Sequence, residues 1–286
     1  QIIGDIPIYV AMDSADTWAN PWLFKLDEKN CPTQVAGCPP DGFSATGQLW
    51  GNPLYNWEVH RNSGYEWWIK RIANCFRLYD VVRIDHFRGF DEYYAIPYGD
   101  ATAENGWWEK GPGIDLFRAI SASLGDREII AEDLGYMTDS VKRLVEESGY
   151  PNMKVIEFAF DERDTGNASD YLPHNYPRNC VVYTGTHDNE TLLSWLEDIT
   201  PAERRQVRKY LNNFKDSGKE LCDDLICLVM QSVANLCIVP MQDYLGLDNS
   251  ARMNQPSTLG KNWKWRLKEG QFTAELQKEM LELATR

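Results

Sequence analysis

Acidic side chains follow three separate apolar segments of the chain, each near the point where the segment ends. Asp85 ends the run DVVRID, Glu132 lies in EIIAED, and Asp188 follows CVVYTGT. Retaining cleavage of a glycosidic bond needs two carboxyl groups, one as nucleophile and one as acid and base. A third carboxylate can hold sugar hydroxyls. The order Asp, Glu, Asp on successive segments therefore indicates a glycosidase-type site.

The neighbours of two of these carboxylates suggest different roles for them. Arg83 lies two residues before Asp85, so on a strand both side chains point to the same face. A guanidinium favours the charged form of a carboxylate, which suits a nucleophile. Glu132 follows apolar residues, and partial desolvation would raise its pKa and suit it to donate a proton. Asp188 is expected to raise that pKa further by like-charge repulsion.

Each carboxylate also has a purely structural interpretation. Asp85 can form a buried ion pair with Arg83, and Glu132 can lie on the surface at a strand end. The segment 186–190 can be a turn or the start of a helix over 190–196. The presence of all three carboxylates at the ends of apolar segments favours a catalytic site over these structural interpretations. Phosphoryl transfer is disfavoured, because the sequence has no glycine-rich phosphate loop.

Composition narrows the class of partner. The 286 residues carry a formal net charge of −14, which disfavours nucleic acid and anionic membranes as partners. The sequence contains no run of about 18 apolar residues, so no membrane span is expected. Seven irregularly spaced cysteines predict free thiols and a cytoplasmic location. The four histidines show no zinc motif. We expect an enzyme with no metal and no cofactor.

The apolar segments predict an α/β fold. Six runs read as buried parallel strands: 4–11, 80–85, 128–133, 154–160, 180–186 and 235–240. Acidic residues at the ends of several strands are typical of a (β/α)8 barrel, which needs eight strands. Residues 14–61, rich in Pro, Gly, Trp and Asn, are expected to form an ordered, loop-rich subdomain inserted after the first of these strands and covering the active site.

Helices are expected between the strands. The spacing of apolar residues and the end signals predict helices at 65–79, 138–148, 219–232 and 273–284, and a capping box begins another at Thr200. Trp68 is expected in the core. The tryptophans of the insertion are harder to bury, so some are expected to stack on sugar rings: Trp18, Trp22, Trp50 and Trp57.

Seven motifs, which span almost the whole chain, resemble the amylomaltases, the 4-α-glucanotransferases of glycoside hydrolase family 77 in the α-amylase superfamily. They are GDIPIYVAMDSADTWANPWLF, VAGCPPDGFSATGQLWGNPLYNW, VVRIDHFRGF, IIAEDLG, YLPHNYP, VVYTGTHDNET and ARMNQPS.

The resemblance implies a role for each matching residue. Asp85 matches the nucleophile, Glu132 the acid/base, and Asp188 the carboxylate that stabilises the transition state. The remaining matches are substrate-binding: Arg83 orients the nucleophile, His187 binds sugar in the cleavage subsite, Asp13 and Asn254 contact sugar, and Trp50 belongs to a mobile loop, 39–50, over the site. The implied reaction transfers part of an α-1,4-glucan to the 4-hydroxyl of an acceptor, with retention.

Two departures from the family pattern shape further expectations. Gly42 stands where bacterial members often carry a tyrosine, which would loosen a contact over the acceptor. The first two barrel strands, and a tyrosine from that region, are expected before Gly4. Residues 1–286 are therefore expected to be a partial barrel truncated at its N-terminus, insoluble or partly unfolded when expressed alone.

Two other functions fit the same residues. An α-amylase-type hydrolase would use the same carboxylates with water as acceptor. A non-catalytic glucan-binding barrel would keep the fold but lose the catalytic residues. The complete set of three carboxylates disfavours this alternative. The sequence does not set the acceptor preference, the product length or the oligomeric state.

Overall fold

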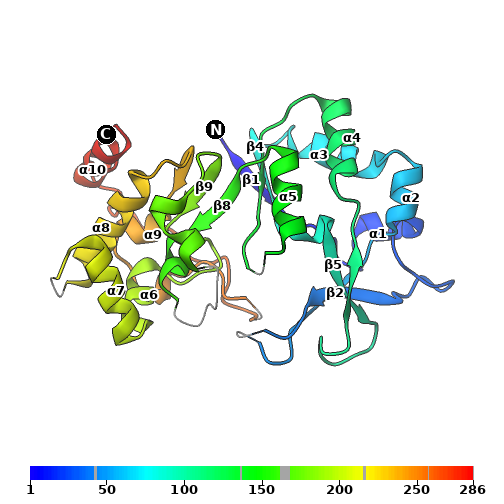
Figure 1. Cartoon of the computed structure of the whole chain (residues 1–286), viewed down its shortest axis with the longest axis horizontal. Coiled ribbons are helices and arrows are strands. Elements are labelled where there is room, and N and C mark those ends of the chain that lie inside the picture. The colour runs from blue at the N-terminus through cyan, green and yellow to red at the C-terminus, as the bar shows by residue number, and fades with distance from the viewer. Residues whose placement is uncertain (42–43, 136, 162–167, 215–216, 257, 286) are drawn as a thin grey trace. The chain divides into compact units, whose positions relative to one another are not determined.

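The computed structural model describes residues 1–41, 44–135, 137–161, 168–214, 217–256 and 258–285. These residues divide into two compact units, Gln1–Asn152 and Met153–Arg286. The first unit runs from blue to green in Figure 1 and the second from green to red. Each unit contains its own three-stranded sheet of segments that the sequence predicted as strands.

The first unit is built on a parallel sheet with the strand order β1-β4-β7. Its strands are β1 (Ile3–Ile6), β4 (Val81–Ile84) and β7 (Ile129–Ala131). Every residue of β4 and β7 is buried, as their apolar sequences predicted. The register pairs Ile84 with Ala131. Asp85 and Glu132 therefore leave neighbouring strands at the same level.

Three helices accompany this sheet: α3 (Glu66–Cys75), α4 (Ile114–Leu124) and α5 (Asp139–Ser148). The helix α4 packs against both α3 and α5. The hydroxyl of Thr138 accepts the N–H of Val141 at the start of α5, and Gly149 ends it at a φ of 71°. The predicted helices at 65–79 and 138–148 are thus confirmed with shifted ends, whereas α4 was not predicted.

A second, antiparallel sheet in the first unit was not predicted. Its strand order is β3-β2-β5-β6. The strands are β2 (Gln34–Cys38), β3 (Gln48–Pro53), β5 (Glu92–Pro97) and β6 (Trp107–Lys110). Short strands with glycine and proline carry little periodicity, so the sequence suggested loops here. Because β2 pairs with β5, the sheet joins residues inside 14–61 to residues beyond it.

The helix α1 (Ala15–Ala19) lies within 14–61, and α2 (Trp57–Asn62) begins within it and ends one residue beyond it. The tryptophans of this segment differ in exposure. Trp57 is buried in the core, whereas Trp18 is 86% exposed and Trp22 and Trp50 are also exposed. Burial of Trp57 removes it from the expected sugar contacts. Trp68, expected in the core, is fully buried there.

The second unit contains the sheet β10-β9-β8, in which β9 and β10 are parallel. Its strands are β8 (Asn152–Val155), β9 (Cys180–Tyr183) and β10 (Leu236–Ile238). Its helices are α6 (Leu192–Asp198), α7 (Pro201–Leu211), α8 (Gly218–Met230), α9 (Met241–Tyr244) and α10 (Ala274–Ala284). Thr200 and Glu203 form the predicted capping box of α7.

One predicted strand of the second unit is wrong in part. Residues 154–160 were expected to be extended, but β8 ends at Val155 and a 3₁₀ helix follows over Ile156–Phe160. Its apolar residues are buried in either conformation, so a short apolar run alone does not decide between them. The helix expected over 190–196 begins at Leu192, after Thr191 as its N-cap.

Two expectations from composition concern the described residues as a whole. The seven cysteines all lie in described segments, and none of them forms a disulfide there. Among the helices described, none has the length and apolar character needed to cross a bilayer.

Replacing Trp68 by alanine in the full-length protein tests the aromatic core of the first unit. The Trp68 ring lies 5.2 Å from that of Phe90 and 5.5 Å from that of Tyr55, measured between centroids. Loss of this packing should lower the free energy of unfolding by about 3 to 5 kcal/mol, measured by urea denaturation. Trp18→Ala is the matched control, and its exposed ring predicts a change within about 0.5 kcal/mol. Equal effects would contradict the assigned core.

Candidate active site

Asp85 and Glu132 lie side by side at one edge of the parallel sheet in the first unit. The N–H of Glu132 donates to the carbonyl of Ile84 at 3.1 Å, which continues the β4–β7 ladder by one residue. Neighbouring strands are about 4.8 Å apart. Two carboxyl groups from adjacent strands therefore reach the same small region, as the sequence suggested from their positions at strand ends.

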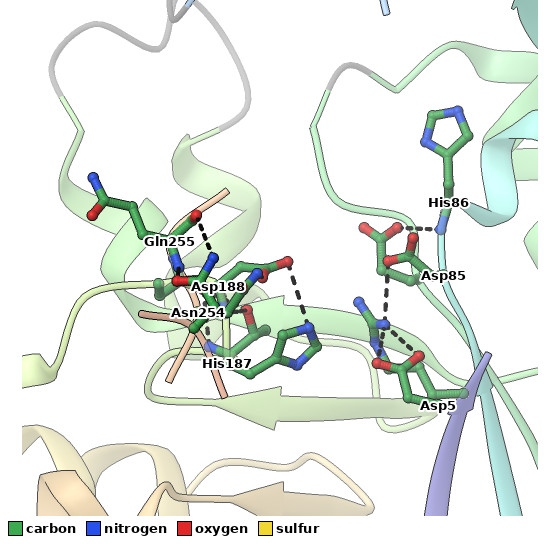
Figure 2. Close-up of polar contacts among 12 residues, drawn as sticks. Asp5, Asp85, His86, His187, Asp188, Asn254 and Gln255 are labelled. Atoms are coloured by element: carbon green, nitrogen blue, oxygen red, sulfur yellow. Dashed lines mark hydrogen bonds and ion pairs between the residues drawn. The ribbon is translucent and has the colours of Figure 1, made fainter. Parts of the chain in front are cut away.

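The guanidinium of Arg83 links this edge to β1. Arg83 Nη1 lies 3.3 Å from Asp85 Oδ1, the ion pair expected from their spacing. The same nitrogen lies 2.7 and 2.8 Å from the two carboxylate oxygens of Asp5. Figure 2 shows these contacts as dashed lines. Asp5 was not predicted from the sequence, because only the strand register that pairs Asp5 with Arg83 reveals it.

Exposure separates the members of this cluster. The side chain of Arg83 is 8% exposed, whereas that of Asp85 is 44% exposed. Glu132 is buried, and its carboxyl accepts the N–H of His86 at 2.6 Å and the N–H of Leu134 at 2.8 Å. The pair thus combines one accessible carboxylate with one that is held by the backbone.

The pKa of Glu132 is raised to about 7: burial is the largest cause and the charge of Asp85 the next, while Arg83 and the two N–H donors act in the opposite direction. A carboxyl that titrates near neutral pH can donate a proton and take one back. The sequence predicted this raised pKa from desolvation. The second carboxylate that contributes is Asp85, and the contribution expected from Asp188 stays a prediction.

Trp50 lies beside the turn that follows Asp85. Its ring is perpendicular to that of His86, with 4.8 Å between centroids, and its Nε1–H donates to Gln48 at 3.1 Å. Burial lowers the pKa of His86 to about 3, so that ring is neutral. Trp50 is 37% exposed. A partly exposed indole near the carboxylates is suited to stacking on a sugar ring.

In the second unit, His187 and Asp188 follow β9. Asp188 Oδ1 accepts a hydrogen bond from Asn254 Nδ2 at 2.5 Å, and Asp188 Oδ2 lies 3.5 Å from His187 Nε2. The N–H of Asn254 donates to the carbonyl of His187 at 3.0 Å. Figure 2 shows the three side chains together. Asn254 therefore orients Asp188, a contact that was not predicted from the sequence.

Arg252 also stabilises the region around Asp188, and this role was not predicted from the sequence. Its Nη2 donates to the carbonyl of Asp188 at 2.6 Å and its Nε to the carbonyl of Asn254 at 3.0 Å. Trp263 packs against His187 with 5.0 Å between ring centroids. Arg252, Trp263 and His187 line a cavity of about 220 Å³ within the second unit. The motif ARMNQPS contained Arg252, but nothing in the sequence indicated that its partners are backbone carbonyls.

The segment 186–190 combines structural and exposed polar groups. The side-chain oxygen of Asn189 accepts the N–H of Thr186 at 2.9 Å and its hydroxyl at 2.8 Å, which forms a turn. Thr191 then begins α6. The interpretation of this segment as a turn therefore holds for Asn189. The side chains of His187 and Asp188 are only partly buried.

Comparison with known proteins places these motifs in a family. The sequence profile described as 4-alpha-glucanotransferase matches residues 1–273. The chain belongs to this family. The resemblance seen in the sequence is thereby confirmed.

Relatives within the 4-alpha-glucanotransferase family come from bacteria and plants. A 4-alpha-glucanotransferase of Streptococcus pneumoniae is 51% identical over the whole chain, which covers 56% of that relative. The Thermus thermophilus enzyme is 48% identical over 96% of this chain and 55% of its own length. The chloroplastic/amyloplastic enzyme of Solanum tuberosum is 47% identical over 93% of this chain and 46% of its own. The chain thus spans about half the length of these relatives.

Solved structures agree with this assignment. The amylomaltase of Streptococcus agalactiae, determined in complex with acarbose, matches with a TM-score of 0.94 and 42% identity, over all of this chain and 57% of that one. The amylomaltase of Corynebacterium glutamicum matches with a TM-score of 0.76 and 19% identity, over 99% of this chain and 46% of that one, and supports the fold alone. The α/β fold is that of the amylomaltases.

Two expectations from the 4-alpha-glucanotransferase motifs stay predictions. Asp13 is exposed in the turn before α1, and its sugar contact is untested. Gly42, where bacterial members often carry a tyrosine, lies outside the described residues. Of the expected loop, 39–41 and 44–50 are described, and Asp41 accepts the N–H of Ser44 at 2.7 Å.

Replacing Asp85 by asparagine tests the cause of the raised Glu132 pKa. The pKa should fall below 7 because like-charge repulsion is removed. It should stay above the ordinary value for glutamate because burial is the larger cause. Carbon-13 NMR titration of the Glu132 carboxyl measures it. Asp80→Asn, which removes a charge from the opposite end of β4, should leave it unchanged; an unchanged pKa in the Asp85 variant would refute the coupling.

Proposed function

We propose that the protein carrying this chain is a 4-α-glucanotransferase that moves part of an α-1,4-glucan to the 4-hydroxyl of an acceptor glucan or glucose. The observation that carries the proposal is the pairing of an accessible Asp85, in contact with Arg83, with a buried Glu132 that titrates near neutral pH. Retaining glycosyl transfer requires one ionised and one protonated carboxyl group.

The first step forms a covalent intermediate. The carboxylate of Asp85 attacks the anomeric carbon while Glu132 protonates the oxygen of the departing glucan, so the glycosidic bond breaks as the ester bond forms. Arg83 holds Asp85 in its charged form through the 3.3 Å contact.

The second step reverses these roles. Glu132, now ionised, removes the proton from the 4-hydroxyl of the acceptor, whose oxygen displaces Asp85 from the anomeric carbon. Two inversions give net retention. A pKa near 7 allows Glu132 to serve as acid in one step and base in the next.

The other residues receive binding roles in this proposal. Asp188, oriented by Asn254 and Arg252, stabilises the charge of the transition state, and His187 binds the sugar at the cleaved bond. Trp50 stacks on a sugar ring, and Asp13 bonds to hydroxyls. The described parts of the expected loop, 39–41 and 44–50, receive the role of covering the site and excluding water, which would otherwise compete with the acceptor.

For the whole protein we propose a (β/α)8 barrel. The two three-stranded sheets, β1-β4-β7 and β10-β9-β8, supply six of its strands. Acidic side chains follow β4, β7 and β9, which fits the rule that such barrels carry their sites at the carboxyl ends of strands.

Replacing Asp85 by alanine in the full-length protein tests the nucleophile. Maltotriose turnover should fall by at least about a thousand-fold, because no covalent intermediate can form. Asp80→Ala at the other end of β4 is the control and should retain activity. Turnover unchanged in the Asp85 variant would show that the nucleophile is assigned wrongly.

The products from maltotriose separate transfer from hydrolysis. Glucose together with chains longer than maltotriose supports transfer, because the bound maltosyl or glucosyl group has reached another sugar. Glucose and maltose alone would establish a hydrolase of the α-amylase type. No turnover at all, in a protein that still binds maltotriose, would favour the non-catalytic glucan-binding alternative.

A further inference from the structure

Glu157 is a buried acid of the second unit to which the proposed reaction gives no role. It lies in the 3₁₀ helix that follows β8 and is 4% exposed. Among the residues that the structure describes, none forms a hydrogen bond with its Oε1 atom. A buried carboxyl oxygen without a partner costs free energy, so its presence calls for a physical explanation.

The Glu157 carboxyl lies against the turn that carries His187 and Asp188. A Cβ atom placed on Gly185 would lie 2.9 Å from Glu157 Oε1 and 3.1 Å from Asn189 Cβ. The side chain of Asn189 also forms a hydrogen bond with the Glu157 carboxyl. Glycine at position 185 therefore allows a close approach between the buried acid and the turn, which a larger residue would prevent.

Asn189 passes this support on to Asp188. Its side-chain oxygen accepts both the N–H of Thr186 at 2.9 Å and the hydroxyl of Thr186 at 2.8 Å. The oxygen of that hydroxyl in turn accepts the N–H of Asp188 at 3.3 Å. A short chain of hydrogen bonds thus connects the buried carboxyl of Glu157 with the backbone of the residue proposed to stabilise the transition state.

Two other carboxyl groups act on Glu157, and both have partners. Asp243 on α9 accepts a hydroxyl at 2.6 Å and a backbone N–H at 2.9 Å. Glu190 accepts a hydrogen bond from Asn249 Nδ2 at 2.8 Å. The positive charge that acts on Glu157 is that of Arg252, whose Nη1 lies 3.8 Å from Glu190 Oε1. Three carboxyl groups therefore share one guanidinium.

This arrangement favours a proton on Glu157. The pKa of Glu157 is raised well above that of an exposed glutamate: burial is the largest cause and the charges of Asp243 and Glu190 are the next, while Arg252 and Asn189 act in the opposite direction. Three ionised carboxylates beside one guanidinium would leave a net negative charge out of water, which is costly. A proton on Glu157 removes that charge from the carboxyl whose Oε1 has no donor.

We propose that Glu157 is a positioning residue for Asp188: its uncharged carboxyl holds Asn189, and with it the turn from which the Asp188 side chain projects. The inference rests on the proposed function, because it assigns Glu157 to the support of a carboxylate in the same reaction. A carboxylate held in place stabilises the charge of the transition state without first reorganising, so loss of this support slows the chemical step.

Two substitutions in the full-length protein separate the hydrogen bond from the space that the side chain fills. E157Q is uncharged, similar in size and keeps a side-chain oxygen, so kcat with maltotriose should stay within about twofold. E157M fills a similar volume without that oxygen, and we expect kcat to fall about tenfold with KM within about threefold. Equal kcat values for the two variants would overturn the proposal.

Hydrogen exchange of the turn measures the same support without turnover. The N–H of Thr186 is protected by its bond to Asn189. A peptide that covers residues 184–190 should therefore exchange faster in E157M and at an unchanged rate in E157Q. Exchange in E157M at the rate of the unchanged protein would show that Glu157 does not support the turn.

A double-substitution cycle tests whether the effect passes through Asn189. If it does, E157M combined with N189A should be about as slow as N189A alone. N249A is the matched control, because Asn249 bonds to Glu190 and to the N–H of Thr191, just beyond the turn. Its effect on kcat should multiply with that of E157M. Effects that also multiply in the pair with N189A would contradict the proposed route.

Urea denaturation tests the charge of Glu157. An acid whose pKa is raised by folding loses its stabilising contribution as the pH rises above the ordinary glutamate value, whereas glutamine does not titrate. The urea midpoint of E157Q should therefore exceed that of the unchanged protein at pH 8 and come closer to it at pH 5. The same difference at both pH values would show that Glu157 is ionised, and the proposal would be wrong.

G185A supplies the same test if E157M does not fold, since the added Cβ would press on Glu157 Oε1. Slower turnover with faster exchange of the turn supports the proposal, and normal values of both overturn it.

The two proposals fail in different ways. If the unchanged protein gives no longer chains from maltotriose, the transferase assignment is wrong, whatever Glu157 does. If the unchanged protein transfers normally and E157M matches it in kcat and in exchange, only the role of Glu157 is wrong.

Discussion

The cluster of charges at the edge of the β1-β4-β7 sheet depends on one buried guanidinium. Arg83 is almost completely removed from water, and a charge in that position is tolerated only with close partners of opposite sign. Asp5 and Asp85 provide them by direct contact, and Glu132 adds its charge from the next strand. Because these residues lie on or just beyond three adjacent strands, the register of the β1-β4-β7 sheet fixes how the charges meet.

Glu132 shows how several opposing effects set one functional property. Burial and the charge of Asp85 favour the protonated carboxyl, while Arg83 and the N–H groups of His86 and Leu134 favour the ionised one. The result is a pKa of about 7, well above that of an exposed glutamate. The role of acid and then base that we propose for Glu132 benefits from such a balance, since neither form is strongly disfavoured at neutral pH.

The second unit uses an arginine differently. Arg252 donates to the carbonyls of Asp188 and Asn254, and Asn254 in turn donates to the Asp188 carboxylate. These bonds fix the loop that follows β9 to the ARMNQPS segment, which is distant in the sequence. They also orient the side chain of Asp188, which is partly exposed. Rigid support of this kind is what a carboxylate needs in order to stabilise charge without reorganising.

The sequence by itself determined the family to which the chain belongs, and it indicated the candidate residues for the proposed chemistry. It indicated the apolar strands, the capped helices, the raised pKa of Glu132 and the Arg83–Asp85 pair, because these depend on neighbours in the chain. Tertiary structure alone decided the rest. Asp5 meets Arg83, Arg252 meets Asp188, and β2 meets β5, across 78, 64 and about 60 residues respectively. Strand register and loop packing set those contacts, and neither leaves a periodic signal in the sequence.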